Sequence, residues 1–379
     1  MLRPRSALAP LLATVLCGGA IGCADGAPTG DAGADAGADA GSDAGADVPA
    51  EVAARDPLGA LGECLGTSAP LTISRQMPYV SLPVGAYRGE FVVDYGSTFS
   101  SIDLAAFPAP GPSASGCDRA QLGVLCTVDD FAFFAPPSPV RLVTGDFRGV
   151  AGSVRQAGIV GTDFTSLRVV TLSYTAARMF VAGSAPCSAA AWRAAGFAPL
   201  STAGFFTHDA GALAPMSSVD AAAPAGARVP NVPTVPVRVG GARAVAQLDP
   251  GFDDTLIPSS LNVNEAFYRA IVASDPGALV RDAARDLSLT TCIPGVAEPV
   301  AAYALAPGRA LEFVDEGGAV ARRHPGATVF VKRTPPSARG CGGIGTWTAP
   351  AAQVAASFFV EMGAVAFDPF ASRVWVPAR

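Results

Sequence analysis

Apolar and polar residues alternate along two stretches of the chain, a pattern typical of half-buried β-strands. One stretch, residues 78–102, reads PYVSLPVGAYRGEFVVDYGSTFSSI, and the other, residues 233–257, reads PTVPVRVGGARAVAQLDPGFDDTLI. Each predicts a strand, a glycine-centred turn and a second strand that runs into an Asp-x-Gly sequence. At one constant offset, Asp94 matches Asp249. We interpret the two stretches as copies of one structural unit.

A second pair of similar segments follows each copy. GIVGTDF at residue 158 is similar to GGIGTW at residue 342, which aligns Ile159-Val160-Gly161 with Gly343-Ile344-Gly345. VVTLSYTAARMFV at residue 169 then matches AVAFDPFASRVWV at residue 364, and both predict a closing hairpin. The second copy has extra residues between these segments, PAAQVAASFF, which predict a short helix.

Both copies share one order: strand, glycine turn, strand, Asp-x-Gly, distal apolar-apolar-Gly and closing hairpin. This order resembles the aspartic protease fold. It is pepsin-like in carrying two lobes on one chain, while the length and ending of each lobe are closer to retropepsin-like units. The lobes are expected at 57–187 and 231–379, with an Ala-, Pro- and Gly-rich interlobe connection at 188–230. The resemblance implies an all-β fold with few short helices, made of two homologous acid-protease-type β-barrel lobes with an interlobe cleft.

The resemblance also implies a catalytic pair. In that family each lobe offers one Asp, and the two carboxyl groups share a proton because they lie too close for both to ionise. One oxygen activates water while the other group protonates the peptide carbonyl. The matching positions are Asp94 and Asp249. Gly96 and Gly251 would let the backbone turn tightly and direct an N–H at each carboxylate, and Ser97 matches the family residue that often hydrogen-bonds the first Asp.

The chain departs from the family around these positions. Tyr95 and Pro250 stand where the family carries Thr or Ser, whose hydroxyl bonds to the opposite loop and holds the aspartates in place. Phe252, the counterpart of Ser97, has no hydroxyl to offer Asp249. The flap tyrosine of pepsin-like enzymes has no counterpart, and its bulk would have to come from Phe131, Phe133 or Phe134. A slowed dyad and an inherited fold whose catalysis has lapsed therefore both stay open.

Other candidate sites are weaker. His208 and His324 lie in polar, turn-like sequence, and no G-x-S-x-G accompanies them, which argues against a serine hydrolase. For Asp253 and Asp254 we favour a solvated strand end over a site for substrate amines or a metal, and we interpret the Arg-Arg-His run at 322–324 as a solvated turn before Pro325. We expect no metal and no cofactor.

Composition narrows the choice of partners. The chain has 379 residues and a formal net charge of −6, and of its 26 basic residues only Lys332 is a lysine. No polybasic block is therefore present to follow a nucleic-acid backbone or an anionic membrane. The 15% of charged residues, with 42 Gly and 33 Pro, indicates many turns and few long surface helices. We expect a monomer that takes a peptide or unfolded protein between its lobes and binds no nucleic acid.

The N-terminus predicts export. Arg3 and Arg5 precede an apolar stretch at 7–22 that is shorter than the ~20 residues needed to span a bilayer. We interpret residues 1–22 as a signal peptide. The stretch ends Ala20-Ile21-Gly22-Cys23, which resembles the bacterial lipobox and makes Cys23 the expected lipidation site, although the favoured Leu is Ala here. Plain cleavage and secretion is the alternative.

Residues 23–56 follow as an expected stalk. Asp recurs at every fourth position among Ala and Gly, so the segment cannot bury enough apolar surface to offset the entropy of ordering. Ala24 follows Cys23, where an inner-membrane protein would carry the Asp retention signal. This favours the outer membrane or cell surface over the inner membrane, with the lipid anchor as the sole membrane contact.

Six cysteines remain after Cys17 and Cys23 are set aside. An even number in an exported chain favours disulfides, and none of the spacings is the C-x-x-C of a zinc site. Six cysteines allow many connectivities, so the pairing is a hypothesis: Cys117 with Cys126, Cys292 with Cys341, and Cys64 with Cys187.

Three hypotheses of function follow. The first is an aspartic-type endopeptidase in the cell envelope, a hydrolase that performs proteolysis. The second is a catalytically inactive pepsin-like lipoprotein that binds a peptide or protein between its lobes, and the third is a merely structural surface lipoprotein. Carboxyl oxygens of Asp94 and Asp249 within about 3–4 Å support the first hypothesis. A wider separation, or Tyr95 filling the cleft, supports the second.

Overall fold

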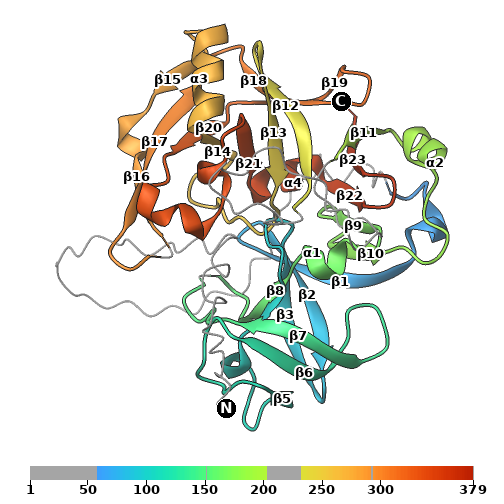
Figure 1. The fold of residues 1–379 in the computed structure, drawn as a ribbon. Coiled ribbons are helices and arrows are strands. Elements are labelled where there is room, and N and C mark those ends of the chain that lie inside the picture. The colour runs from blue at the N-terminus through green and yellow to red at the C-terminus, as the bar shows by residue number, and fades with distance from the viewer. Residues whose placement is uncertain (1–57, 151, 203–231, 292, 379) are drawn as a thin grey trace, which may run out of the picture.

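A computed structural model of the protein describes residues 58–150, 152–202, 232–291 and 293–378. These residues are mostly β, with few and short helices, as the sequence predicts (Figure 1). The expected signal peptide, Cys23, the stalk and His208 lie outside the described residues. No helix within the described ranges is long and apolar enough to cross a membrane.

The first lobe is a barrel-like sheet in which apolar side chains alternate inward. Val80, Leu82 and Val84 are buried in its core, together with Phe91 and Val93. Its strands are β1 (Thr67–Ser74), β2 (Met77–Val84), β3 (Tyr87–Val93), β4 (Ser101–Ile102), β5 (Ala114–Ser115), β6 (Leu125–Phe131), β7 (Ser138–Thr144) and β8 (Gln156–Val160). β3 runs parallel to β8, β8 antiparallel to β4, and β4 parallel to β7.

The second lobe repeats this arrangement. β13 runs parallel to β21, β21 antiparallel to β14, and β14 parallel to β20. Its strands are β12 (Thr234–Val239), β13 (Ala242–Leu248), β14 (Ser260–Asn264), β15 (Leu279–Arg281), β16 (Leu287–Thr290), β17 (Ala297–Leu305), β18 (Ala310–Val314), β19 (Val320–Pro325), β20 (Thr328–Lys332) and β21 (Ala351–Val354). The expected pair of homologous lobes is therefore present (Figure 1).

One part of the predicted repeat is wrong. The strand that pairs with β13 as β8 pairs with β3 is β21, so Val354 takes the place of Val160. Residues 343–345, the predicted match, instead fall in or next to the 3-10 turn η6 (Ile344–Thr346). The true match is hidden in the sequence because Ala355, and not Gly, follows Val354.

Short helices complete the lobes. α1 (Thr162–Thr165) follows β8, and α4 (Ala356–Met362) follows β21, so the predicted short helix over 350–359 is a strand and then a helix. α3 (Glu265–Ser274) is capped by Asn264, whose side chain accepts the Phe267 N–H at 2.9 Å. The remaining turns are η2 (Gly62–Leu65), η3 (Leu104–Ala106), η4 (Ala283–Arg285) and η5 (Pro336–Cys341).

A shared sheet joins the two lobes. Its strand order is β11-β23-β22-β9-β10-β1, built from β9 (Val170–Ser173), β10 (Arg178–Val181), β11 (Phe197–Ser201), β22 (Ala364–Asp368) and β23 (Arg373–Pro377). In Figure 1 the red C-terminal hairpin, β22 and β23, lies between the green strands β9 and β11. α2 (Ala189–Ala194) and β11 occupy part of the predicted interlobe connection. One hydrophobic core runs through both lobes and this sheet, which holds the lobes in a fixed relation.

Two disulfides are present as predicted. Cys64 of η2 bonds Cys187 ahead of α2, with Cα atoms 4.8 Å apart. Cys117 bonds Cys126 and closes the loop between β5 and β6, with Cα atoms 5.4 Å apart. Cys341 is also in a disulfide, while its predicted partner, Cys292, lies outside the described residues.

Candidate active site

Asp94 and Asp249 meet between the lobes, each at the end of an equivalent strand. The Asp94 N–H donates to the Val160 carbonyl at 3.0 Å, and the Asp249 N–H donates to the Val354 carbonyl at 3.2 Å. These matching bonds fix each Asp at the same place in its lobe. The two carboxyl groups hydrogen-bond to each other. The structure thus brings together the two carboxylates that the sequence repeat singles out.

Glycine follows each Asp-x pair because no other residue fits. The N–H groups of Gly96 and Gly251 donate to their own Asp carboxylates at 2.6 and 3.1 Å. A Cβ on Gly96 would lie 2.2 Å from Asp249 Oδ2, and one on Gly251 would lie 2.7 Å from Asp94 Cγ. Neither glycine has a left-handed φ. Close approach to the opposite carboxyl, more than a tight turn, therefore requires glycine here.

Burial makes both carboxyls of the pair harder to ionise. Asp94 is 1% exposed and Asp249 is 0% exposed. Burial raises the pKa of both carboxyls, and the charge of Asp94 helps raise the pKa of Asp249 well above its usual range. The rise in the pKa of Asp94 is opposed by hydrogen bonds from Asp249 and from the backbone of Gly96 and Ser97. The two carboxyls therefore titrate as a coupled pair in which burial favours retention of a shared proton.

Ser97 contributes through its backbone rather than its hydroxyl. The hydroxyl donates to the Phe99 carbonyl at 2.8 Å, whereas the backbone N–H serves Asp94. The role that the resemblance implied for the Ser97 side chain is therefore not the one the structure shows.

Tyr95 does not fill the space between the lobes. Its ring is fully buried and stacks on Phe367 of β22, with ring centroids 3.6 Å apart and planes 11° from parallel. Two of the three phenylalanines that could replace the bulk of a flap tyrosine also lie in the core. Phe131 and Phe133 are buried and pack edge-on against Phe164.

Three amide side chains beside Asp249 were missed at the level of sequence. Gln353 Nε2 donates to Asp249 Oδ2 at 2.6 Å, and Gln353 Oε1 accepts from Asn262 Nδ2 at 3.0 Å. Gln247 Nε2 donates to the Gly96 carbonyl of the other lobe at 3.2 Å. Gln247 had a visible signal, because it interrupts an apolar strand two residues before Asp249. Gln353 has no such signal, because its strand, β21, is followed by Ala355 and so lacks the apolar-apolar-Gly motif that ends β8.

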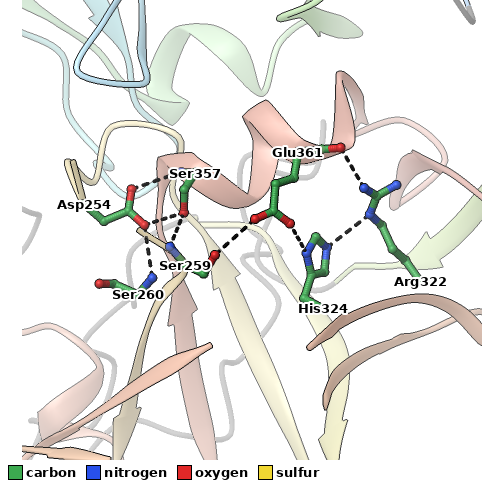
Figure 2. A network of polar contacts seen from close by, with 7 residues as sticks. All are labelled: Asp254, Ser259, Ser260, Arg322, His324, Ser357 and Glu361. Carbon is green, nitrogen blue, oxygen red and sulfur yellow. Dashed lines mark hydrogen bonds and ion pairs between the residues drawn. The ribbon is translucent and has the colours of Figure 1, made fainter. Parts of the chain in front are cut away.

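Two segments that were expected to be solvated instead carry buried charged or polar side chains. Asp254 is buried, and its carboxylate accepts N–H groups of Ser260 and Ser357, each at 3.1 Å, and the Ser357 hydroxyl (Figure 2). Its neighbour Asp253 is partly exposed and forms an ion pair with Arg75 of the other lobe.

Residues 322–324 were predicted to be a solvated turn, and this prediction is wrong. They belong to β19, in which Arg322 and His324 point inward and Arg323 outward. Arg322 Nε donates to His324 Nε2 at 3.1 Å, and His324 Nδ1 lies 2.9 Å from a Glu361 carboxylate oxygen (Figure 2). The period of a strand explains the burial, because every second residue of β19 faces the core.

Candidate metal ligands do not gather in the part of the chain that the structure describes. No group of three His, Cys, Asp or Glu side chains within those ranges is placed to hold an ion. The groups that the chain presents at the dyad are the two carboxyls, their backbone donors and the Gln353 amide.

Comparison with known proteins finds similarity of architecture alone. The sequence matches no family model and no curated protein. Among solved structures, it is similar to an aspartic proteinase from Irpex lacteus, with 12% identity, 82% of this chain and 97% of that chain covered, and a TM-score of 0.40. It is also similar to Basic 7S globulin from soybean, with 11% identity, 82% and 95% coverage, and a TM-score of 0.40.

Proposed function

We propose that the chain is an aspartic-type endopeptidase that hydrolyses peptide bonds in peptides or unfolded proteins held between its lobes. One observation carries the proposal: two carboxyl groups from equivalent strand ends hydrogen-bond to each other, and each accepts the N–H of the glycine two residues on. Such a pair shares one proton, which is the state that acid–base catalysis of peptide hydrolysis needs.

The proposed reaction uses both members of the pair. In this proposal Asp94 is the charged member, and it takes a proton from a water molecule while the water oxygen attacks the peptide carbonyl carbon. Asp249 gives its proton to the carbonyl oxygen, which leaves a neutral tetrahedral diol. Asp94 then passes its proton to the leaving amine nitrogen, the C–N bond breaks, and a diol hydroxyl returns a proton to Asp249. Protons and charges balance, and the pair returns to its starting state.

The proposed setting is outside the cytoplasm. Disulfides such as Cys64–Cys187 persist in oxidising compartments. We propose that the body is exported and tethered through Cys23 to the outer membrane or cell surface, where it works as a monomer on peptide substrates, without a cofactor and without a nucleic-acid partner. The acidic stalk would keep the body clear of the membrane.

A non-catalytic binding protein is the second candidate, and one observation favours it. The two carboxyls are almost completely buried, whereas hydrolysis requires water and a peptide carbonyl to reach both. In that reading the pair holds the lobes together and the protein binds a peptide without cleaving it.

Cleavage of an unfolded protein substrate between about pH 3 and 7 tests the proposal. Hydrolysis should be greatest in acid, where one carboxyl is protonated and the other ionised, and should fall as the second proton leaves. Asp94→Asn and Asp249→Asn should each lower the rate by about 1,000-fold or more, because an amide cannot exchange these protons. Asp282→Asn, which changes a carboxylate ion-paired to Arg285 away from the pair, should leave the rate unchanged.

Absence of cleavage at every pH would remove the endopeptidase and leave the binding protein. Cleavage that survives Asp94→Asn would place the chemistry elsewhere in the molecule.

A further inference from the structure

The surroundings of the two aspartates differ between the lobes. In the second lobe, the strand register pairs Gln247 of β13 with Gln353 of β21, and Gln353 with Asn262 of β14. Three amides therefore form a row across neighbouring strands, next to the end of β13 that carries Asp249. In the first lobe the same register pairs Val92 with Ile159, and Ile159 with Ser101. The amide row belongs to the second lobe alone.

Gln353 is held in one orientation by its two contacts. Its Oε1 accepts the Asn262 amide at 3.0 Å, which leaves its Nε2 to donate to Asp249 Oδ2 at 2.6 Å. The other oxygen of Asp249 accepts the Gly251 N–H. Each oxygen of this carboxyl therefore has its own donor, and rotation of the carboxyl would break both bonds.

Gln247 extends the row to the other lobe. Its Nε2 donates to the Gly96 carbonyl at 3.2 Å, and the Gly96 backbone is the segment that lies against the Asp249 carboxyl. The bond is buried, so an unpaired amide or carbonyl here would be costly. It provides the cross-lobe hydrogen bond that Tyr95 and Pro250 cannot make.

We propose that Gln353, oriented by Asn262, is a positioning residue that fixes the Asp249 carboxyl and keeps it ionisable in a fully buried site. Gln353 supplies Asp249 with a side-chain donor, and Gln247 supplies the contact between the loops that Tyr95 and Pro250 cannot make. The effect on catalysis rests on the proposed endopeptidase function, whereas the effect on the Asp249 carboxyl does not.

Direct titration of the carboxyl carbons by NMR, on protein labelled with ¹³C at Asp, tests the proposal without an activity assay. A donor to a carboxylate favours its charged form, so Gln353→Met should raise the apparent pKa values of the Asp94–Asp249 pair by about one unit. Asn262→Leu leaves Gln353 in place but free to turn away, and should shift the pair in the same direction by less.

Gln156→Met is the matched control. Gln156 is a buried glutamine on β8, the strand equivalent to β21, and its Oε1 accepts the Tyr79 hydroxyl at 3.1 Å rather than a dyad carboxyl. The Gln156→Met variant loses a buried glutamine amide and one buried hydrogen bond, as Gln353→Met does, but should leave the pKa values of the Asp94–Asp249 pair unchanged. Tyr174, whose pKa is raised by burial and by the charge of Asp249, is the same in all variants.

A shift of the pair in Gln353→Met no larger than in Gln156→Met would overturn the proposal. If the wild-type protein cleaves its substrate, the alkaline limb of its pH–rate profile should move up by the same unit in Gln353→Met. If the wild-type protein cleaves nothing, the endopeptidase fails while the titration still decides the role of Gln353.

Discussion

Tyr95, the middle residue of the first Asp-x-Gly sequence, packs in the hydrophobic core. Its ring stacks on Phe367 and ties the Asp94 loop to the shared sheet. Tyr95→Thr supplies a hydroxyl but removes the ring and leaves a cavity, so it should destabilise the protein by about 3 kcal/mol and should not raise catalysis. Tyr95→Phe keeps the ring and should lose no more than about 1.5 kcal/mol. Urea unfolding of the two variants measures the difference, and equal losses would contradict this reading.

Site residues could be predicted from the sequence where they occupy equivalent positions of the repeat. They could not be predicted where their role depends on a contact between strands that are distant in the sequence. Asp94 and Asp249 were found because both copies of the repeat end in Asp-x-Gly. The donor to Asp249 could not be found, because Gln353 reaches it from a strand that follows about a hundred residues later. Strand register, which pairs Gln353 with Gln247 and Asn262, exists only in the folded sheet.

At the element scale, each lobe fastens the helix after its buried strand with a carboxylate and a serine. In the first lobe, Asp163 of α1 accepts the Ser100 N–H at 3.0 Å and its hydroxyl at 2.6 Å. In the second lobe the roles are exchanged, because Ser357 of α4 donates to Asp254 (Figure 2). This exchange preserves the fastening although the sequences differ.

Removal of the second-lobe carboxylate tests this fastening. Asp254→Ala leaves the buried donors of Ser260 and Ser357 without an acceptor, so we expect a loss of about 3 kcal/mol in the free energy of unfolding. Asp282→Ala, which breaks an ion pair with partly exposed partners, should lose less than about 1 kcal/mol. Chemical denaturation of both variants provides the comparison. Similar losses would show that the buried carboxylate has no special role in holding α4.

Strand prediction succeeded where alternation was apolar and failed where it was polar. The hairpins at 78–93 and 234–248 follow directly from apolar alternation. β19 also alternates, but its inward residues are Arg322 and His324, which composition alone assigns to solvent. Packing of His324 between Phe313 and Phe358, and its pairing with Glu361, make burial possible. No local sequence signal reports these partners.

At the scale of the whole molecule, the two lobes share one sheet and one hydrophobic core, and the Asp94–Asp249 pair lies where the lobes meet. Strands β9 and β22 pair in antiparallel register, so the ends of the two lobes are bonded directly. The Arg75–Asp253 ion pair adds a second link between the lobes. The lobes therefore present the two carboxyls in a fixed geometry, and the protonation state of the dyad affects the stability of the whole fold.

That coupling gives the stability of the protein a definite pH dependence. Burial raises the folded-state pKa of Asp249 well above that of an unfolded aspartate, about 3.9, so the folded protein binds the extra proton more tightly. The associated stability is fully present below the unfolded pKa and is lost as pH rises through the folded pKa. Asp249→Asn removes this titration, but its NH2 group must face either the Gly251 N–H or the Gln353 amide donor, which adds a cost that is the same at every pH. The melting temperature of the variant should therefore fall relative to that of the wild type as pH decreases from about 7 to 3. Asp163 and Asp254, whose pKa values burial also raises, are present in both proteins and cancel in the comparison. Thermal unfolding from about pH 3 to 8 checks this, and a difference between the two melting temperatures that stays the same at every pH would show that the titration of Asp249 is not coupled to folding.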